Sequence, residues 1–434
     1  MKCYLHIGTE KTGSSLLQEW LYHNREVLLE EGVYLCKSLD APNNRRLAAY
    51  FQPRFDDYFR DRGIADRESR DKFFDGFLEG FRAEIAEAAQ HCHSVVVTSE
   101  HLSSRLHSTE DIGRLHEELS GLFDAITVIC YVREQSSLRR SLYSTALRAG
   151  ETIALDSFQT EIGSGQRFYN YFELLGDWGA VFGGDALSVG IYERERFPGG
   201  DIRKDFLQRI EFKTDPDLLD YVVATANEGL SPVQATLIRL ANRFARGAHE
   251  DSGVLRREIL ALASGDSRLR LGTLHSELDG EIYSRFEECN RGFFARFFGE
   301  DANLFQPPVA KVRVFEGEDS FFEGLNEVLE ALLTRLLALE HPNLVPSEVL
   351  RAADVDLLRD VAMTYETGSS ITKRQAIRLM ELAREGRPLG ARINEFLVRH
   401  SDQKRKPAET PAEESLNSVI ELNSVVLKSD PAAG

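Results

Sequence analysis

The residues with the clearest chemical potential form a short loop near the N-terminus of the chain. Gly8 and Gly13 bound this loop, Lys11 lies inside it, and Ser14 and Ser15 follow it directly. An apolar run precedes the loop and a helical pattern follows it, so the N–H groups of the loop and of the first helical turn point at one place. Such N–H groups bind anions, helped by the helix dipole. The loop therefore predicts an anion-binding site.

The glycine spacing matches the Walker A loop of nucleoside triphosphatases only in part. Four residues separate Gly8 from Gly13, as in that loop, but Ser14 stands where a triphosphatase needs lysine. The lysine lies instead inside the loop, as Lys11. A strict kinase or ATPase reading therefore fails at the residue that contacts the outer phosphates. The alternative to an anion-binding loop is an ordinary glycine-containing turn between a strand and a helix.

A second candidate anion site follows the strongest strand pattern of the chain. Arg133 comes directly after this apolar run, and Ser141 lies eight residues later on a predicted helix. Ligands of open α/β sheets bind beyond the carboxyl ends of the strands, and arginine grips phosphate with two hydrogen bonds. Both residues are therefore candidates for phosphate binding. The alternative is a salt-bridging surface arginine and a solvated serine.

Together the two motifs resemble the sulfotransferase family that uses 3′-phosphoadenosine 5′-phosphosulfate (PAPS) as donor. The run His6–Gln18 looks like the K-T-G-[ST]-[ST] signature of this family, in the form common in bacterial members. The resemblance implies that Lys11 binds the bridging oxygen and the sulfuryl group. It also implies that the N–H groups of Thr12–Ser15 hold the 5′-phosphate.

The resemblance extends to the rest of the donor. The family binds the 3′-phosphate with an arginine at a strand end and a serine eight positions later, which implies this role for Arg133 and Ser141. The run Val189–Glu193 resembles a late strand of the family, so Tyr192 would stack on or bond the adenine. A half-buried tyrosine at the end of a strand is the alternative. The named motifs cover about the first 230 residues.

A general base is expected at the end of the strand pattern Val95–Val97. Family members take the proton of the acceptor with a histidine or a glutamate, and this strand end offers both, as Glu100 and His101. We expect Glu100 to be the base, because the Ser-Glu pair directly after this strand recurs in bacterial relatives. His101 is the alternate. Glu100 could instead be a solvated turn carboxylate, or a partner of Lys11 or Arg133.

The elements that must position these residues alternate between strand and helix. Four short apolar runs have strand character. They are Cys3–Ile7, Val95–Val97, Ile126–Val132 and Leu187–Tyr192. Helical patterns that begin near Ser14, Ser108 and Gln135 separate them. Apolar strands separated by helices predict an α/β fold, with a parallel central sheet covered on both faces. His6, in the first run, is expected to be a core histidine or to line the site from below.

The strand signal fades after about residue 227, and helical patterns follow. We expect an α/β domain over residues 1–305, a helical C-terminal region over 306–400 and a disordered tail over 401–434. The boundary is expected at Gln306–Pro308. Apolar residues recur at helical spacing over Phe321–Leu339, which predicts a helix that packs into a core.

The composition argues against several classes of protein. The 434 residues carry a formal charge of -18, so the chain is a poor candidate for binding nucleic acid or an anionic membrane. Five cysteines are too far apart for a zinc site or a redox pair, and we expect no metal. With no apolar stretch after Met1 and no run long enough to cross a bilayer, we expect a cytoplasmic protein.

The sequence thus favours a PAPS-dependent sulfotransferase that needs no metal. The expected acceptor is a hydroxyl or amine of a glycan, a lipid or a small molecule. One alternative is a P-loop kinase with a relocated lysine, which would need Mg²⁺. The other is a non-catalytic nucleotide-binding or scaffolding protein. The sequence leaves the acceptor and the oligomeric state open.

Overall fold

The computed structural model of the chain describes residues 1–222, 229–247, 256–257, 259–261, 263, 273–308, 359, 363, 373–388 and 390–400. The chain divides into two compact units, Met1–Phe321 and Phe322–Gly434. The candidate site residues all belong to the first unit. The predicted helix over 321–339 and the predicted tail over 401–434 lie outside the described residues.

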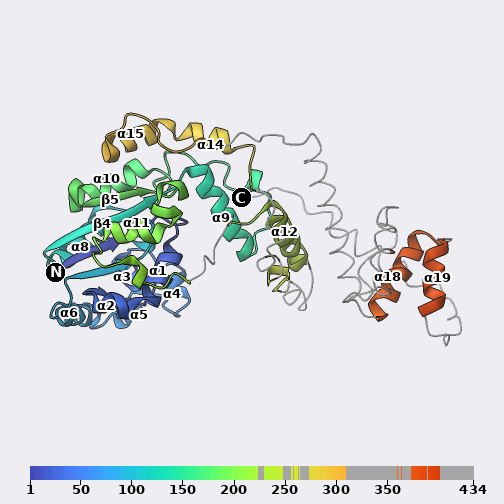
Figure 1. Cartoon of the computed structure of the whole chain (residues 1–434), viewed down its shortest axis with the longest axis horizontal. Coiled ribbons are helices and arrows are strands. Elements are labelled where there is room, and N and C mark those ends of the chain that lie inside the picture. The colour runs from blue at the N-terminus through green and yellow to red at the C-terminus, as the bar shows by residue number, and fades with distance from the viewer. Residues whose placement is uncertain are drawn as a thin grey trace. The chain divides into compact units, whose positions relative to one another are not determined.

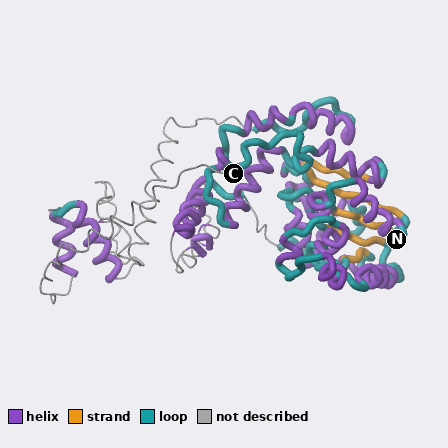
Figure 2. Tube along the Cα trace, turned by 180° about the vertical axis from the view of Figure 1, so that it is seen from behind, coloured by secondary structure: helices purple, strands orange, loops and turns teal. Residues whose placement is uncertain are grey.

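A five-stranded sheet forms the centre of the first unit. Its strands are β1 (Lys2–His6), β2 (Val33–Leu35), β3 (Ser94–Thr98), β4 (Ala125–Val132) and β5 (Leu187–Ile191). They lie in the order β2-β3-β1-β4-β5, and every neighbouring pair is parallel. In Figure 2 the strands, in orange, lie among the purple helices of this unit. The predicted α/β fold with a parallel sheet is confirmed.

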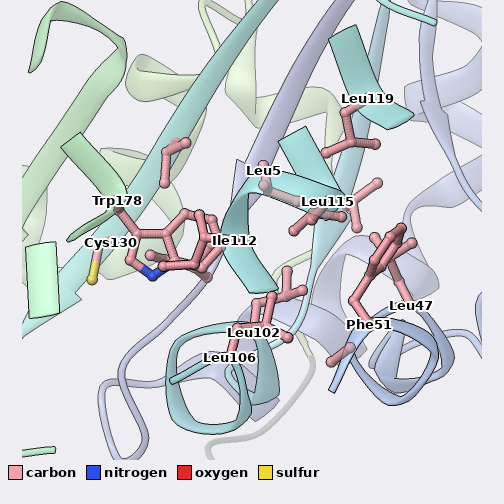
Figure 3. Close-up of a cluster of buried hydrophobic side chains, with 14 of the residues drawn as sticks. Leu5, Leu47, Phe51, Leu102, Leu106, Ile112, Leu115, Leu119, Cys130 and Trp178 are labelled. Atoms are coloured by element: carbon pink, nitrogen blue, oxygen red, sulfur yellow. The ribbon is translucent and has the colours of Figure 1, made fainter. Parts of the chain in front are cut away.

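Side chains of the central strands alternate between two hydrophobic layers. Leu5 of β1 and Cys130 of β4 point to the layer formed with α8 (Thr109–Ser120) and α10 (Tyr171–Phe182). Figure 3 shows Leu5 beside Leu115 of α8 and Cys130 beside Trp178 of α10. The strand residues that alternate with these along β1 and β4 pack on the opposite face, against α1 (Ser14–His23) and α11 (Ile202–Arg209). Burial on both faces explains why these strands read as continuous apolar runs.

The remaining described helices of the first unit either connect the strands or follow β5 (Figure 1). They are α2 (Arg25–Glu30), α3 (Arg45–Phe51), α4 (Asp57–Arg60), α5 (Arg67–Phe73), α6 (Phe77–Ala88), α7 (His101–Arg105), α9 (Gln135–Ala149), α12 (Pro232–Gly247), α14 (Asp279–Arg285) and α15 (Glu287–Phe298). Short 3-10 turns cover Leu155–Ser157, Gly184–Ala186, Arg194–Arg196, Pro198–Gly200 and Pro216–Leu218.

One strand of the sheet was not predicted from the sequence. The edge strand β2 has three residues, which are too few to show a periodic pattern. The segment Asp279–Phe298 contains two helices, α14 and α15, which meet at Phe286. The fully buried Phe286 ends the first helix and starts the second, so the apolar pattern continues across the break.

The second unit contains a pair of helices among its described residues. These are α18 (Lys373–Gly386) and α19 (Ala391–His400). Their buried faces meet in a small core that includes Met380, Ile393 and Phe396.

His6, the last residue of β1, is fully buried. Its Nδ1 lies 2.8 Å from Thr98 Oγ1, and its ring contacts the rings of Tyr131 and Phe206 edge-on. Within the described part of the chain, its Nε2 has no hydrogen-bond partner. Burial lowers the pKa of His6 to about 4, although the charge of Glu100 opposes this shift. His6 is therefore a neutral core histidine beneath the loop.

This buried histidine predicts a pH-dependent loss of stability. The pKa of His6 is lower in the folded chain than in the unfolded chain, so the unfolded chain binds the extra proton between about pH 6.5 and 4. The contribution of His6 to stability is complete above this window and is lost as the pH falls through it. In His6→Asn, the decline of the unfolding free energy between pH 8 and pH 5.5 should be smaller than in wild type by on the order of 1 kcal/mol.

Urea unfolding followed by the fluorescence of the buried Trp20 and Trp178 measures this decline. The exposed His91→Asn is the matched control and should keep the wild-type pH profile. If His6→Asn also keeps that profile, His6 does not carry the shift.

Candidate functional site

The loop from Ile7 to Gly13 leaves β1 in a backbone conformation that depends on three left-handed residues. These are Gly8 (φ 70°), Lys11 (φ 65°) and Gly13 (φ 80°). Glycine adopts this region freely, but Lys11 has a Cβ and adopts it only with support from its surroundings.

The neighbouring strand β4 fixes the start of the loop. Thr9 donates twice to the carbonyl oxygen of Tyr131, from its N–H at 3.0 Å and from its hydroxyl at 3.1 Å. The Cys130 thiol donates to the carbonyl oxygen of Gly8. The carbonyl of Thr9 accepts from Thr12 Oγ1 at 2.6 Å and from Ser14 Oγ at 3.4 Å. The hydroxyls of Thr12 and Ser14 therefore brace the loop from inside.

The N-terminus of α1 fits an anion. The helix begins at Ser14, and among the described residues no side chain caps it and no acidic side chain lies in its first turn. The first N–H groups of a helix have no partner within the helix, so they are donors for a ligand. Ser15 is exposed beside them, whereas Thr12 and Ser14 are buried. The resemblance to sulfotransferases would place the 5′-phosphate of the donor at this helix N-terminus.

Lys11 lies among charges of both signs. Burial lowers the pKa of its ammonium group, and the nearby Arg148 of α9 lowers it further. The carboxylates of Glu10 and Glu100 oppose these two effects. The cation is therefore held in a partly desolvated position, where its attraction for an anion is stronger than in water.

Glu100 lies directly against the loop. A Cβ built on Gly8 would be 2.7 Å from the Cβ of Glu100, so glycine is required at position 8 for space as well as for φ. Each carboxylate oxygen of Glu100 accepts one amide hydrogen bond. The donors are Gln18 of α1 at 2.7 Å and Asn43 at 3.4 Å. The side chain is therefore held in one orientation beside Gly8.

The segment between β2 and α3 holds the end of β3. Asn44 accepts from the N–H of Thr98 at 2.9 Å, and Asn43 accepts from Ser99 Oγ at 3.1 Å. The carbonyl oxygen of His6 accepts from the N–H of Ser99 at 2.9 Å. These bonds place the turn that carries Glu100 next to the end of β1.

His101, the first residue of α7, follows Glu100 directly. Its Nε2 is 3.9 Å from Glu100 Oε1, and its buried Nδ1 has no hydrogen-bond partner among the described residues. Burial lowers the pKa of His101, and Glu100 opposes the shift, so the ring is neutral at pH 7.

A chain of ion pairs borders this side of the site. Arg105 pairs with Glu10 at 3.5 Å and with Asp56 at 2.9 Å. Arg45 pairs with the same Asp56 at 3.1 Å and with Asp57 at 2.7 Å. Arg45 holds the pKa of Asp57 down, to about 2. The rim next to His101 is therefore polar.

Arg133 reaches the loop from the opposite side. It follows β4 directly, and its Nη1 donates to the carbonyl oxygen of Lys11 at 3.1 Å. Its Nε donates to Ser137 Oγ at 2.9 Å. Its carbonyl oxygen accepts from the hydroxyl of Tyr171 at 2.6 Å. Burial lowers the pKa of Arg133, but a guanidinium remains charged.

The structure brings Ser137, and not Ser141, into contact with Arg133. Ser137 lies in the first turn of α9, whose N-terminus Glu134 caps by accepting from two backbone N–H groups at 2.7 Å. Ser141 lies one turn further along the same face and is partly exposed. Arg148, whose charge acts on Lys11, lies two turns beyond Ser141. A row of polar residues on α9 thus leads away from the loop.

Tyr192 closes the loop at its other end. It follows β5, and its N–H donates to the carbonyl oxygen of Val132 at 2.7 Å. A Cβ on Gly13 would be 3.0 Å from the Tyr192 ring, and the guanidinium of Arg133 lies 5.5 Å from the ring centroid. The ring packs between the loop and Arg133.

Three polar residues of the site were missed in the sequence. Gln18 and Ser137 each carried a signal in their spacing. Gln18 lies four residues after Ser14, on the same face of the helix. Ser137 lies four residues after Arg133, in the first turn of the helix that follows it. Asn43 carried none, because a long-range contact brings its turn to Glu100.

Within the described residues, no group of three or more histidine, cysteine, aspartate or glutamate side chains is placed to hold a metal ion. None of the described helices combines the length and the apolar character needed to cross a membrane.

Comparison with known proteins gives distant similarities. No protein-family model matches the chain. A protein of Archaeoglobus fulgidus described as uncharacterized is 24% identical over 172 residues, which are 40% of this chain and 46% of that protein. The chain thus spans about half the length of this curated relative. The crystal structure of a sulfotransferase from Alicyclobacillus acidocaldarius aligns with 61% of this chain and 96% of that chain, at 14% identity and a TM-score of 0.29. Neither similarity carries a conclusion about chemistry.

The close approach of Gly8 to Glu100 predicts the cost of a methyl group. Gly8→Ala places a Cβ at 2.7 Å from Glu100, whereas a Cβ on Gly63, at nearly the same φ of 68°, would meet no atom within 4 Å. Both variants strain the backbone, but Gly8→Ala should be less stable than Gly63→Ala by about 1–3 kcal/mol, the usual cost of overpacking. Urea unfolding measures the difference. Equal stabilities would contradict the contact between the loop and Glu100.

Proposed function

We propose that the protein is a PAPS-dependent sulfotransferase, which moves a sulfuryl group to a hydroxyl or amine of an acceptor. One observation supports this most: Lys11, Glu100 and Arg133 meet at one loop. Glu100 packs against Gly8 at one side of the loop, and Arg133 binds the carbonyl oxygen of Lys11 at the other. A cation for the leaving phosphate, a base for the proton of the acceptor and an arginine for the 3′-phosphate are the three groups that we expect sulfuryl transfer from this donor to use.

The donor would lie across the loop and along the start of α9. The N–H groups of Thr12–Ser15 would hold the 5′-phosphate, and Lys11 would contact the bridging oxygen and the sulfuryl group. Arg133 and Ser141 would bind the 3′-phosphate, and Tyr192 would lie against the adenine. Arg148 adds positive charge on the same side. Together these groups suit a ligand that carries several negative charges.

In the reaction, an oxygen or nitrogen of the acceptor bonds to sulfur as the bond from sulfur to the phosphate oxygen breaks. The negative charge that develops on the leaving phosphate is stabilised by Lys11. The proton of the acceptor passes to Glu100, which Gln18 and Asn43 hold in place. His101 is the alternate base, since its ring is neutral at pH 7. Positioning and charge stabilisation account for most of the catalysis in such a loose transfer.

A P-loop kinase with a relocated lysine is the alternative enzyme, and Mg²⁺ distinguishes the two. Nucleotide kinases hold the metal with a carboxylate and a loop hydroxyl. In this loop the hydroxyls of Thr12 and Ser14 donate to Thr9 instead. We expect transfer and nucleotide binding to persist in EDTA. Strict dependence on Mg²⁺ in the same assay would favour the kinase.

The donor assignment predicts discrimination between two nucleotides. 3′-Phosphoadenosine 5′-phosphate should bind more tightly than AMP by on the order of 1.5–3 kcal/mol, because only the former offers a 3′-phosphate to Arg133 and Ser141. Ser141→Ala should reduce this difference and leave AMP binding unchanged. Calorimetric titration measures both. Equal affinities in the wild-type protein would overturn the assignment.

The three catalytic candidates predict different kinetic effects. Lys11→Ala should lower both donor affinity and turnover, since the ammonium acts in the ground state and in the transition state. Glu100→Gln should lower turnover by about 10²–10⁴-fold, the usual contribution of a general base, with donor affinity unchanged or slightly improved. His101→Ala should cost little. Steady-state kinetics with PAPS, together with nucleotide titration, separate the three effects.

The reverse pattern, with Glu100→Gln active and His101→Ala inactive, would transfer the role of base to His101 and leave the sulfotransferase in place. Nucleotide binding without turnover in any variant would favour the non-catalytic alternative.

A further inference from the structure

The guanidinium of Arg133 is held by groups that belong to the protein itself. Its Nε donates to Ser137 Oγ at 2.9 Å, and its Nη1 donates to the carbonyl oxygen of Lys11 at 3.1 Å. Its face lies 5.5 Å from the centroid of the Tyr192 ring. The backbone of Arg133 is also fixed, through the hydroxyl of Tyr171. A side chain whose only role was to bind a phosphate would need none of these contacts with the loop.

The contact with Lys11 falls where the loop most needs support. Lys11 is the residue with a Cβ among the three left-handed residues of the loop, at φ 65°. Arg133 binds the carbonyl oxygen of this residue, and it reaches Gly13 through the ring of Tyr192. Lys11 and Gly13, which begin and end the second half of the loop, are therefore both connected to the guanidinium of Arg133.

We infer that Arg133 is a positioning residue for Lys11, and that Ser137 orients Arg133 for this purpose. The ammonium group of Lys11 is aimed by a backbone whose conformation Arg133 stabilises. The inference rests on the proposed function for the identity of the ligand, but the effect of Arg133 on the loop does not depend on it. Substitution of Arg133 should therefore alter the conformational stability of the loop and the reaction at the 5′ end of a nucleotide, even where no 3′-phosphate is present.

Amide hydrogen exchange of the nucleotide-free, full-length chain tests the effect on the loop. In Arg133→Met, the N–H of Thr9, which donates to Tyr131, should exchange faster by about tenfold or more within the peptide that spans Gly8–Gly13, the equivalent of one charge-assisted hydrogen bond. Ser137→Ala should show a smaller increase in the same peptide. Ser141→Ala, which removes a hydroxyl from the same face of α9, should exchange as wild type. Unchanged exchange in folded Arg133→Met would overturn the inference.

A donor that lacks the 3′-phosphate tests the consequence for chemistry. With adenosine 5′-phosphosulfate, Arg133→Lys keeps the charge but loses the fixed fork, and its kcat should fall by about tenfold with a smaller change in KM. Thr145→Ala, which removes an exposed hydroxyl elsewhere on α9, should leave both constants for this donor unchanged. If Arg133→Lys affects only donors with a 3′-phosphate, Arg133 reads that phosphate alone and the inference is wrong.

The two experiments separate this inference from the proposed function. Faster loop exchange in Arg133→Met, in a protein that transfers no sulfuryl group, would support the positioning role and contradict the sulfotransferase. Normal exchange in a protein that transfers sulfuryl groups would do the opposite. Ser137→Ala removes only one hydroxyl, so it carries the exchange test if Arg133→Met fails to fold.

Discussion

The parallel pairing of β1 with both β3 and β4 is the constraint on which the site depends. β1 is the central strand of the sheet, and its partners on either side end at the same edge. The residues that follow these three strands are Lys11 in its loop, Glu100 and Arg133. Because parallel strands place their carboxyl ends together, residues as far as 122 positions apart in sequence meet around one loop. The hydrogen bonds from Thr9 to Tyr131 and from Ser99 to His6 then fix the spacing.

Much of the fold could be predicted because its signals are local. The strands are buried on both faces, so they are continuous apolar runs, and α8 and α9 begin at side chains that cap them, Ser108 and Glu134. The short edge strand β2 gives no such signal. The break between α14 and α15 gives no such signal either, because the buried Phe286 continues the apolar pattern through it. Both features are fixed by packing against the rest of the unit.

The candidate site was predictable in part for the same reason. Lys11, Glu100 and Arg133 each follow a recognisable strand, and the three strands are neighbours in the sheet, which brings these residues together. The groups that orient them were harder to find. Asn43 reaches Glu100 from a turn after β2, and the contact of Arg133 with Lys11 uses a backbone carbonyl, which sequence patterns do not reveal. The charged residues of the site could be identified from the sequence, whereas the hydrogen bonds that orient them could not.

The proposed function requires that a sulfuryl group is transferred at this loop. Incubation of the full-length chain with PAPS that carries radiolabelled sulfur, in EDTA, with a panel of glycans, lipids and phenols as acceptors, measures this transfer. We expect label to move from the donor to a member of the panel, with release of 3′-phosphoadenosine 5′-phosphate, and Lys11→Ala to abolish it. Tight nucleotide binding without movement of label to any acceptor, or transfer of phosphate from ATP that requires Mg²⁺, would contradict the proposed function.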